Sequence, residues 1–227
     1  MAEATGTPSG AVRAASYFSY RHPGQLAMAP LAPRRVLDIG CGSGEALAEF
    51  RARGAVRTVG IEIDPGAGAV AAARPDVDVV LVGDVEETLA QVTDHAFDLV
   101  IASHVLEHLV DPWTVTRRLV ALLAPGGSLL GGVPNVRHAP TVARLLVRGS
   151  WEYADAGILD RTHLRFFTRR SLEDMLTGAG LRDVTIRPDF GASRHARRLD
   201  QLTFGRLSDL WAFAYDFHAR TPTLGDA

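Results

Sequence analysis

From residue 34 onward, short apolar runs alternate with segments of helical spacing. Five runs precede residue 135: RRVLDIG (34–40), TVGIEID (58–64), DVDVVLVGD (76–84), FDLVIAS (97–103) and GSLLGGVP (127–134). Runs of this length, rich in Val, Ile and Leu, are typical of strands buried on both faces. The helical segments between them predict an α/β fold, a parallel sheet with helices on both faces.

The pattern changes after residue 135. TVARLLVRG (141–149) has helical spacing, but residues 150–168 have no clean period. We therefore expect an insertion at about residues 136–170, over the edge of the sheet. The remaining predicted elements are a helix over 171–180 with Ser171 as N-cap, a strand over 182–188, a helix over 197–210 and a strand over 211–219, where Trp211, Phe213, Tyr215 and Phe217 alternate. Residues 1–33 are expected to form a tail and lid helix ahead of one domain, 34–227.

The carboxyl ends of the predicted strands hold the first candidates for chemistry, because a doubly wound sheet binds ligands there. Asp38 lies in the first run, and the glycine turn GCGSG (40–44) follows it. Glycines allow a ligand to approach the backbone closely, and the next helix presents free N–H groups. A dinucleotide fingerprint needs a third glycine where this chain has Glu45. An adenosine with a short amino-acid tail, which lacks phosphates, fits this turn better.

Two further acids stand at strand ends. Glu62 lies near the end of the second run and can accept hydrogen bonds from two ribose hydroxyls. Asp84 ends the third run and can accept a hydrogen bond from an exocyclic amine such as adenine N6. The alternative is that both acids only cap strand ends. A glycine turn followed by two such acids nevertheless favours a nucleoside site.

The stretches VLDIGCGSGE, GIEIDP, LVGDVE and FDLVIASHVLEHLVDP resemble the successive motifs of class I S-adenosylmethionine-dependent methyltransferases. The segment VPNVRHAPTVARLLVRGSWEYADAGILDRTHLRFFTRRSLEDML resembles a bacterial subgroup that acts on small molecules and sugars. The resemblance implies a Rossmann-like, seven-stranded, mostly parallel sheet with one antiparallel strand, for which the C-terminal run is a candidate. It also implies S-adenosyl-L-methionine as cofactor and S-adenosyl-L-homocysteine as product.

The resemblance assigns residues to parts of this cofactor. Gly40 and Gly42 would pass under the methionyl part, and Glu62 would hold the ribose. The other residues it implies around the cofactor are Asp38, Cys41, Ile63 on the adenine, Asp84 and the backbone of Val85 at the adenine edge, Ser103 and His104 near the sulfonium, and Tyr20 and Arg21 in a lid. Arg21 is either a partner of the cofactor carboxylate or a solvated arginine. Cys41, at a helix N-terminus, is either a thiol of lowered pKa or a small residue chosen for space.

Three histidines are candidate bases: His104, His108 and His163. Histidine titrates near neutrality, and a base is needed when the acceptor must lose a proton. His108 has the alternative role of bracing the loop. The spacing His104-x-x-Glu107-His108 also matches an inverted zinc-protease motif, but it follows a strand in a different fold. No metal ligand is assigned on that basis; a divalent ion that orients an acceptor hydroxyl stays an alternative. Asn135 and His138 are candidates to line the acceptor pocket.

The amino-acid composition of the chain limits the classes of binding partner that we expect. The 227 residues carry 24 basic and 26 acidic side chains, which disfavours nucleic acid as a partner. Residues 161–198 nevertheless hold nine arginines against four acids, which either attract an anionic acceptor or form a solvated face. The single cysteine excludes intrachain disulfides, and no apolar run suits a membrane span. We expect a cytoplasmic enzyme without a membrane segment, monomeric or homodimeric.

The function we predict is methyl transfer to an oxygen or nitrogen of a small-molecule acceptor, in secondary-metabolite biosynthesis. One alternative is O-methylation of a sugar in a surface polysaccharide or glycosylated product. Alternatives from other classes are a nicotinamide-dependent oxidoreductase, against which Glu45 argues, and a non-catalytic adenosine-binding subunit.

Overall fold

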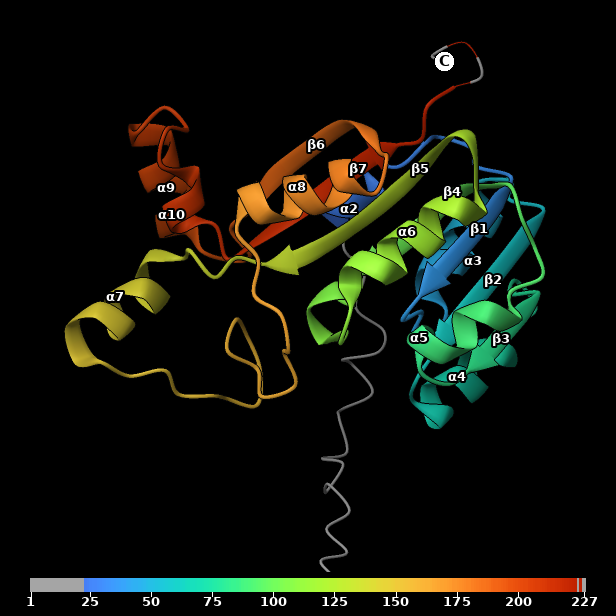
Figure 1. The fold of residues 1–227 in the computed structure, drawn as a ribbon, viewed down its shortest axis with the longest axis horizontal. Coiled ribbons are helices and arrows are strands. Elements are labelled where there is room, and N and C mark those ends of the chain that lie inside the picture. The colour runs from blue at the N-terminus through green and yellow to red at the C-terminus, as the bar shows by residue number, and fades with distance from the viewer. Residues whose placement is uncertain (1–22, 224, 226–227) are drawn as a thin grey trace, which may run out of the picture.

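A seven-stranded sheet organises the part of the chain that the computed structural model describes, residues 23–223 and 225 (Figure 1). Its strand order is β3-β2-β1-β4-β5-β7-β6. The strands are β1 (Arg35–Ile39), β2 (Arg57–Glu62), β3 (Val79–Val82), β4 (Phe97–Ser103), β5 (Leu123–Pro134), β6 (Arg182–Asp189) and β7 (Ala214–Arg220). Strands β1 to β5 pair in parallel, and β7 is antiparallel to both β5 and β6. The predicted Rossmann-like sheet with an antiparallel C-terminal strand is confirmed.

The winding of the sheet reverses beside β1. This strand pairs with β2 on one side and with β4 on the other, so the chain leaves β3 and restarts across the sheet. Such a switch point opens a crevice beyond the carboxyl ends of the two central strands. The glycine turn after β1 and the histidine-rich turn after β4 therefore border the same crevice.

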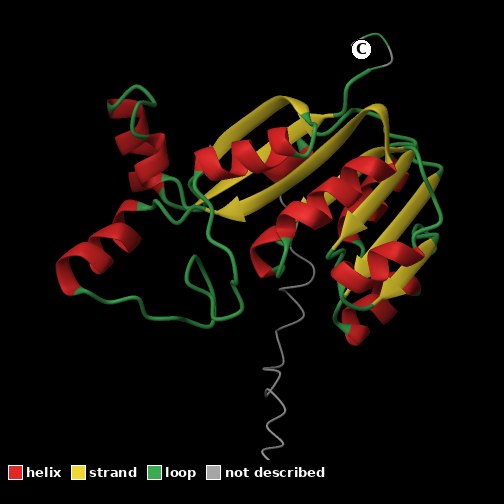
Figure 2. Ribbon diagram, in the orientation of Figure 1, coloured by secondary structure: helices red, strands yellow, loops and turns green. Residues whose placement is uncertain are grey.

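Helices cover both faces of the sheet (Figure 2). They are α2 (Pro23–Leu26), α3 (Glu45–Ala52), α4 (Pro65–Ala72), α5 (Val85–Thr88), α6 (Pro112–Leu122), α7 (Ala139–Arg148), α8 (Arg169–Gly178), α9 (Arg194–Leu202) and α10 (Ser208–Trp211), with 3-10 turns η1 (Leu89–Gln91) and η2 (Leu106–His108). One apolar core joins Phe50 of α3 to Val36, and the other joins Leu119 of α6 and Leu172 of α8 to Leu37. Within residues 23–223 and 225, no helix combines the length and apolarity needed to span a bilayer.

Acid–proline pairs start two of these helices. The Asp64 side chain accepts a hydrogen bond from Ala67 N, and Pro65 occupies the first turn of α4. Asp111 caps α6 in the same way, with Pro112 in its first turn. Proline is tolerated there because its missing N–H would have had no helical partner.

The C-terminal segment and the start of α8 differ from the prediction. The helix expected over 197–210 is two helices, α9 and α10, interrupted near Gly205, which has φ of 72°. Trp211 ends α10, so only the second half of the alternating run is a strand. The N-cap of α8 is Thr168, and Ser171 is its capping-box partner three residues later.

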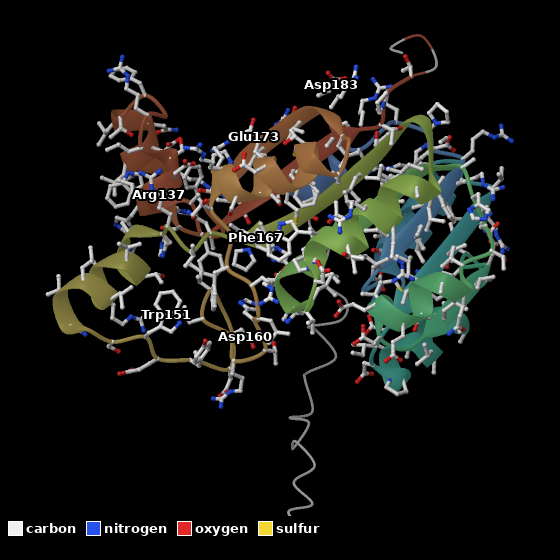
Figure 3. The ribbon with its side chains drawn as sticks, viewed as in Figure 1. Arg137, Trp151, Asp160, Phe167, Glu173 and Asp183 are labelled. Carbon is white, nitrogen blue, oxygen red and sulfur yellow. The ribbon has the colours of Figure 1, made fainter. Side chains whose placement is uncertain are left out.

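The segment between β5 and α8 carries α7 and few regular elements. Figure 3 shows its labelled residues Trp151 and Asp160 beyond the carboxyl end of β5. It is tied back to the fold where Val136 N donates to Phe167 O, and Asn135 pairs as an isolated bridge with Phe167. This is the segment that the sequence predicts as an insertion.

Candidate active site

The glycine turn has a backbone that only glycine adopts readily. Gly40, Gly42 and Gly44 have φ of 71°, 55° and 81°, all in the left-handed region. Gly40 N and Cys41 N both donate to Ile61 O, at 2.7 and 3.1 Å, which ties the turn to β2. A Cβ on Gly40 would lie 2.5 Å from Cγ2 of Val105. Glycine is therefore needed in this turn for two reasons: the left-handed backbone and the lack of room for a side chain.

Glu62 connects the turn to the end of β2. Its side chain is buried, and its two oxygens accept hydrogen bonds from Gly42 N at 2.7 Å and Asp64 N at 2.9 Å. Asp38 is also buried, and burial, with the charge of Glu62 as a second cause, raises its pKa well above the usual range. Two buried acids thus interact through their charges at these strand ends, and Glu62 accepts hydrogen bonds from two backbone N–H groups.

The residues predicted around the adenine lie at the next strand ends. Ile63 exposes 67% of its surface, which is unusual for an apolar residue beside a buried strand. Asp84 is exposed, and its Oδ1 caps α5 by accepting from Glu86 N at 2.8 Å. Val85 is buried, so its backbone is the part that can meet a ligand. Asp84 therefore does act as a helix cap, as the alternative proposed. The cap uses one carboxylate oxygen, and the side chain remains exposed.

Cys41 packs inside the second core. Its side chain is buried, and a Cβ on Gly60 would lie 2.6 Å from its Sγ. Burial, with the charges of Asp38 and Glu62 as further causes, raises the pKa of the thiol. The alternative of a reactive thiol with lowered pKa is therefore wrong, because burial and two nearby acids outweigh the helix N-terminus. Cys41 serves as a small packing residue whose backbone belongs to the turn.

The end of β4 is joined to the segment before β1. Ser103 Oγ donates to Oε1 of Gln25, a buried residue of α2, at 2.5 Å. Sequence reasoning missed Gln25, because nothing local marks a glutamine 78 residues from its partner. Tyr20 and Arg21, the predicted lid residues, lie outside the described residues.

His104 and Glu107 form a pair directly after β4. His104 has φ of 54°, a left-handed conformation that costs energy in a residue with a Cβ. Its Nδ1 lies 3.2 Å from Oε1 of Glu107, which is 1% exposed. Burial pulls the pKa of His104 down, but the hydrogen bond and charge of Glu107 outweigh it, and the pKa is raised. Strain at this position is typical of a functional turn.

His108 and His163 meet although they come from distant segments. Their rings contact edge to face with centroids 4.8 Å apart. Nδ1 of His108 lies 3.1 Å from Thr162 O, and Nδ1 of His163, which is buried, lies 3.0 Å from Ile158 O. The three predicted histidines thus gather around Glu107, which the sequence placed between His104 and His108 in a possible metal-binding pattern.

The pocket-lining predictions for residues after β5 have different outcomes. Asn135 is fully buried, and its Nδ2 donates to Asp209 O and Ala212 O, both at 2.8 Å. Both hydrogens of Nδ2 are used in these bonds, so the side chain holds the C-terminal segment and has no donor left for an acceptor molecule. His138 is half-buried beside Phe213, and burial lowers its pKa.

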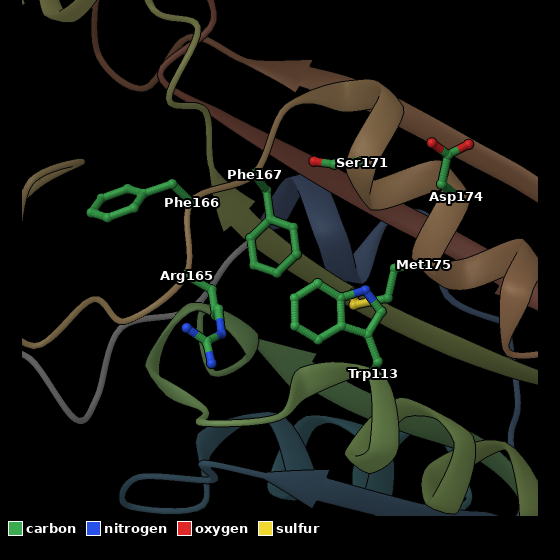
Figure 4. Close-up of a pocket in the computed structure, with 7 residues that line it drawn as sticks. All are labelled: Trp113, Arg165, Phe166, Phe167, Ser171, Asp174 and Met175. Atoms are coloured by element: carbon green, nitrogen blue, oxygen red, sulfur yellow. The ribbon is translucent and has the colours of Figure 1, made fainter.

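Three arginines of the segment 161–198 are engaged with the protein. Arg161 pairs with Asp155, and Arg169 pairs with Asp209. Arg165 donates to the backbone of Val110. A groove of about 260 Å³ lies near this segment. Figure 4 shows the side chains that line it: Trp113, Arg165, Phe166, Phe167, Ser171, Asp174 and Met175. The charges of Arg161 and Arg169 are thus already compensated within the chain, which makes these two side chains less available to an anionic acceptor.

Comparison with known proteins assigns the chain to a family. A family model described as "Methyltransferase domain" matches residues 18–186, well over half of the chain. The chain belongs to this methyltransferase family and is an S-adenosylmethionine-dependent methyltransferase. The assignment sets aside both alternatives from other classes, the oxidoreductase and the non-catalytic subunit.

Curated relatives and solved structures agree with the family. A protein of Paracidovorax citrulli named ubiquinone biosynthesis O-methyltransferase is 32% identical over 169 residues, which cover 68% of this chain and 69% of that protein. One of the same name from Xanthomonas oryzae pv. oryzae is 37% identical, but the match covers 55% of this chain and 57% of that protein. A SAM-dependent methyltransferase from Archaeoglobus fulgidus superposes with a TM-score of 0.60 at 22% identity, covering 83% of this chain and 86% of that one. This last likeness shows the fold.

Proposed function

We propose that the crevice beside β1 holds the cofactor through the residues at three strand ends. The bare backbone of Gly40 and Gly42 would pass under its methionyl part, and Glu62 would accept from its ribose. Ile63 supports this proposal because it exposes an apolar face where an adenine would stack. Asp84 supports it because it stays at the surface of the next strand end. These features fit a nucleoside without phosphates.

We further propose that the acceptor is a hydroxyl oxygen of a small molecule. S-adenosylmethionine, when bound, supplies a methyl group already activated by its sulfonium. The chain then has to position the acceptor and accept its proton, because a hydroxyl must lose a proton to keep the new ether neutral. The observation that carries the proposal is the His104–Glu107 pair at the carboxyl end of β4. Neutral amines can lose their proton to water after transfer and need such a pair less.

His104 is the general base in this proposal. Glu107 accepts from its Nδ1 and so orients the ring, as a buried carboxylate does in other histidine–acid pairs. The strained backbone of His104 is also bonded, since its N donates to Gly132 O at 2.9 Å. The backbone bond holds the residue at the end of β4, and the contact with Glu107 orients its ring. Base catalysis of this kind is worth about 10²–10⁴-fold in rate.

The class of hydroxyl is a choice between a phenol and a sugar. The matched curated relatives are named as O-methyltransferases of ubiquinone biosynthesis, and this supports an oxygen acceptor. The edge-to-face pair of Trp151 and Phe166, with centroids 5.3 Å apart, lies in the segment after β5 and supports an aromatic acceptor. We therefore favour a hydroxylated aromatic over a nucleotide-linked sugar.

Turnover with three acceptor classes tests the proposal. S-adenosylhomocysteine release is measured with a catechol, a nucleotide-linked hexose and a primary amine, and the product is located by mass spectrometry. The expected result is O-methylation of the catechol, with turnover lowered about 100-fold or more by His104→Gln. The matched control is His195→Gln, an exposed histidine of α9, which should leave turnover unchanged. N-methylation alone, or full activity of His104→Gln, would refute the proposal.

For the setting of the reaction we propose the cytoplasm and a monomer or homodimer, with no nucleic acid partner. The near balance of 24 bases and 26 acids supports the last point. Sedimentation of the purified chain with and without a short RNA tests both the oligomeric state and the absence of RNA binding.

A further inference from the structure

Three metal-ligating side chains converge beside the proposed acceptor site. Glu107 and His108 belong to η2, and His163 comes from the loop before α8. One ligand atom from each lies within 4.8 Å of the other two. Leu164 N and Arg165 N both donate to Glu107 O, at 2.8 and 3.0 Å. These backbone bonds hold the loop against η2, so the cluster is part of the folded core and not a chance meeting of surface side chains.

Glu107 carries an unsatisfied oxygen in this cluster. The residue is 1% exposed, and its Oε1 is paired with His104 Nδ1. Its Oε2 is buried and has no hydrogen-bond partner among the described residues. A buried carboxylate oxygen without a partner is costly, and the usual remedies are a donor, a water or a cation.

The two imidazoles are oriented as metal ligands usually are. A carbonyl oxygen only accepts, so Nδ1 of His163 donates to Ile158 O and Nδ1 of His108 donates to Thr162 O. The Thr162 hydroxyl also lies 3.1 Å from Nδ1 of His108, but its proton is donated to Asp160 Oδ1, so it too can accept from this nitrogen. In a neutral ring the lone pair then resides on Nε2. Metal-binding histidines typically donate their second N–H to a carbonyl or carboxylate in this way.

We propose that Glu107, His108 and His163 bind one divalent transition-metal ion, with Zn²⁺ as the reference member of that class. Two imidazoles and one carboxylate form a set typical of open zinc and ferrous sites. Ligand distances near ~2.1 Å require the three atoms to approach one another by about an ångström. His108 is half-buried, so a rotation of its side chain would be enough to supply this movement.

A metal here changes the roles of two predicted bases. An imidazole nitrogen that binds a metal has no lone pair for a proton, so His108 and His163 become ligands and His104 is left as the base. Three protein ligands leave positions for an acceptor hydroxyl, whose pKa a bound cation lowers. This role, unlike metal binding itself, rests on the proposed function.

Metal binding is tested on the full chain, purified without a polyhistidine tag and stripped with a chelator. Zn²⁺ alone is titrated against a chromophoric indicator, and Co²⁺ is followed by its visible ligand-field absorption. We expect one equivalent of Zn²⁺ and at least a ~100-fold loss of affinity in His163→Gln, because loss of a direct ligand exceeds the ~10–100-fold effect of outer-shell changes. His108→Gln, at a less buried position, is the second variant.

The matched control is His218→Gln, since His218 is also half-buried and hydrogen-bonded, to Ser128 Oγ, but lies on β7. It should bind Zn²⁺ as the unaltered chain does. Absence of stoichiometric binding, or equal affinity in folded His163→Gln, His108→Gln and the control, overturns the proposal. Tight binding without O-methylation refutes the proposed function and leaves the metal site standing. O-methylation at full rate in chelator refutes the metal's role in the reaction.

Discussion

Replacing Glu62 by alanine removes one carboxylate that has two partners in the folded chain. Its oxygens accept from Gly42 N and Asp64 N, at 2.7 and 2.9 Å, and the side chain is buried. The first bond holds the glycine turn, and the second holds the start of the loop to α4. In the proposed complex the same carboxylate also accepts from the ribose. The substitution therefore tests the shape of the turn and the cofactor contact together.

The magnitude follows from these bonds. A hydrogen bond to a charged group contributes about 1.5–3 kcal/mol. Water can enter the space and satisfy part of the loss, and the nearby Asp38 is relieved of a repulsive charge, since Glu62 is a secondary cause of its raised pKa. We expect the free energy of unfolding to fall by about 2–4 kcal/mol. Cofactor binding should weaken by about 1–3 kcal/mol, which is roughly 5–150-fold.

Calorimetric titration with S-adenosylhomocysteine, beside urea unfolding of the same samples, separates the two effects. Glu86→Ala is the matched control, because Glu86 also accepts from two backbone N–H groups, those of Val110 and Asp111, both at 3.0 Å. The control should lose stability and keep its affinity. Unchanged affinity in folded Glu62→Ala would show that the ribose lies elsewhere. An equal loss in Glu86→Ala would show that the affinity falls through destabilisation alone.

Further predictions concern the turn, the cluster and an ion pair. Gly40→Ala should lose about 1–3 kcal/mol of stability, measured by urea unfolding, because it strains the left-handed turn and meets Val105; unchanged stability would contradict the geometry. His163→Ala should lower turnover more than S-adenosylhomocysteine affinity, and the reverse would place it in the cofactor site. Arg57 lowers the pKa of Asp94, so this pair stabilises the fold above the unfolded pKa near 3.8 and the contribution disappears as pH falls through the lower folded value. Asp94→Asn should therefore lower Tm at pH 7 and have little effect at pH 2, and an equal loss at both would contradict this.

Much of the fold follows from local patterns in the sequence. Parallel strands buried on both faces appear as apolar runs, and the five runs before residue 135 are the five parallel strands β1 to β5. Glycine is required wherever φ is positive and the backbone is bare, and so the turn at Gly40–Gly44 was predictable. The carboxyl ends of parallel strands lie at one edge of the sheet, and the strand pattern therefore predicts that Glu62 and Asp84 share that edge.

A local residue pattern cannot predict the structure when a helix end and a strand can both carry it. The alternation of Trp211, Phe213, Tyr215 and Phe217 predicts one strand, yet Trp211 ends α10. The helix is closed by a bond from Ala212 N to Ser208 O, while Tyr215 and Phe217 pair with β5. Period-two spacing is necessary for a half-buried strand but does not say where pairing begins; that depends on the neighbouring strand.

The features of the candidate site also fall into two groups, those set by local sequence and those set by tertiary contacts. The sequence by itself determined the sheet, the glycine turn and the acids that follow it, because each depends on residues close together in the chain. Only the tertiary structure brought His163 close to His108 and Glu107. It also placed Gln25 where Ser103 donates a hydrogen bond to it, and it buried the thiol of Cys41. Those contacts join segments far apart in sequence, and their energy depends on the path of the whole chain, which no local spacing records.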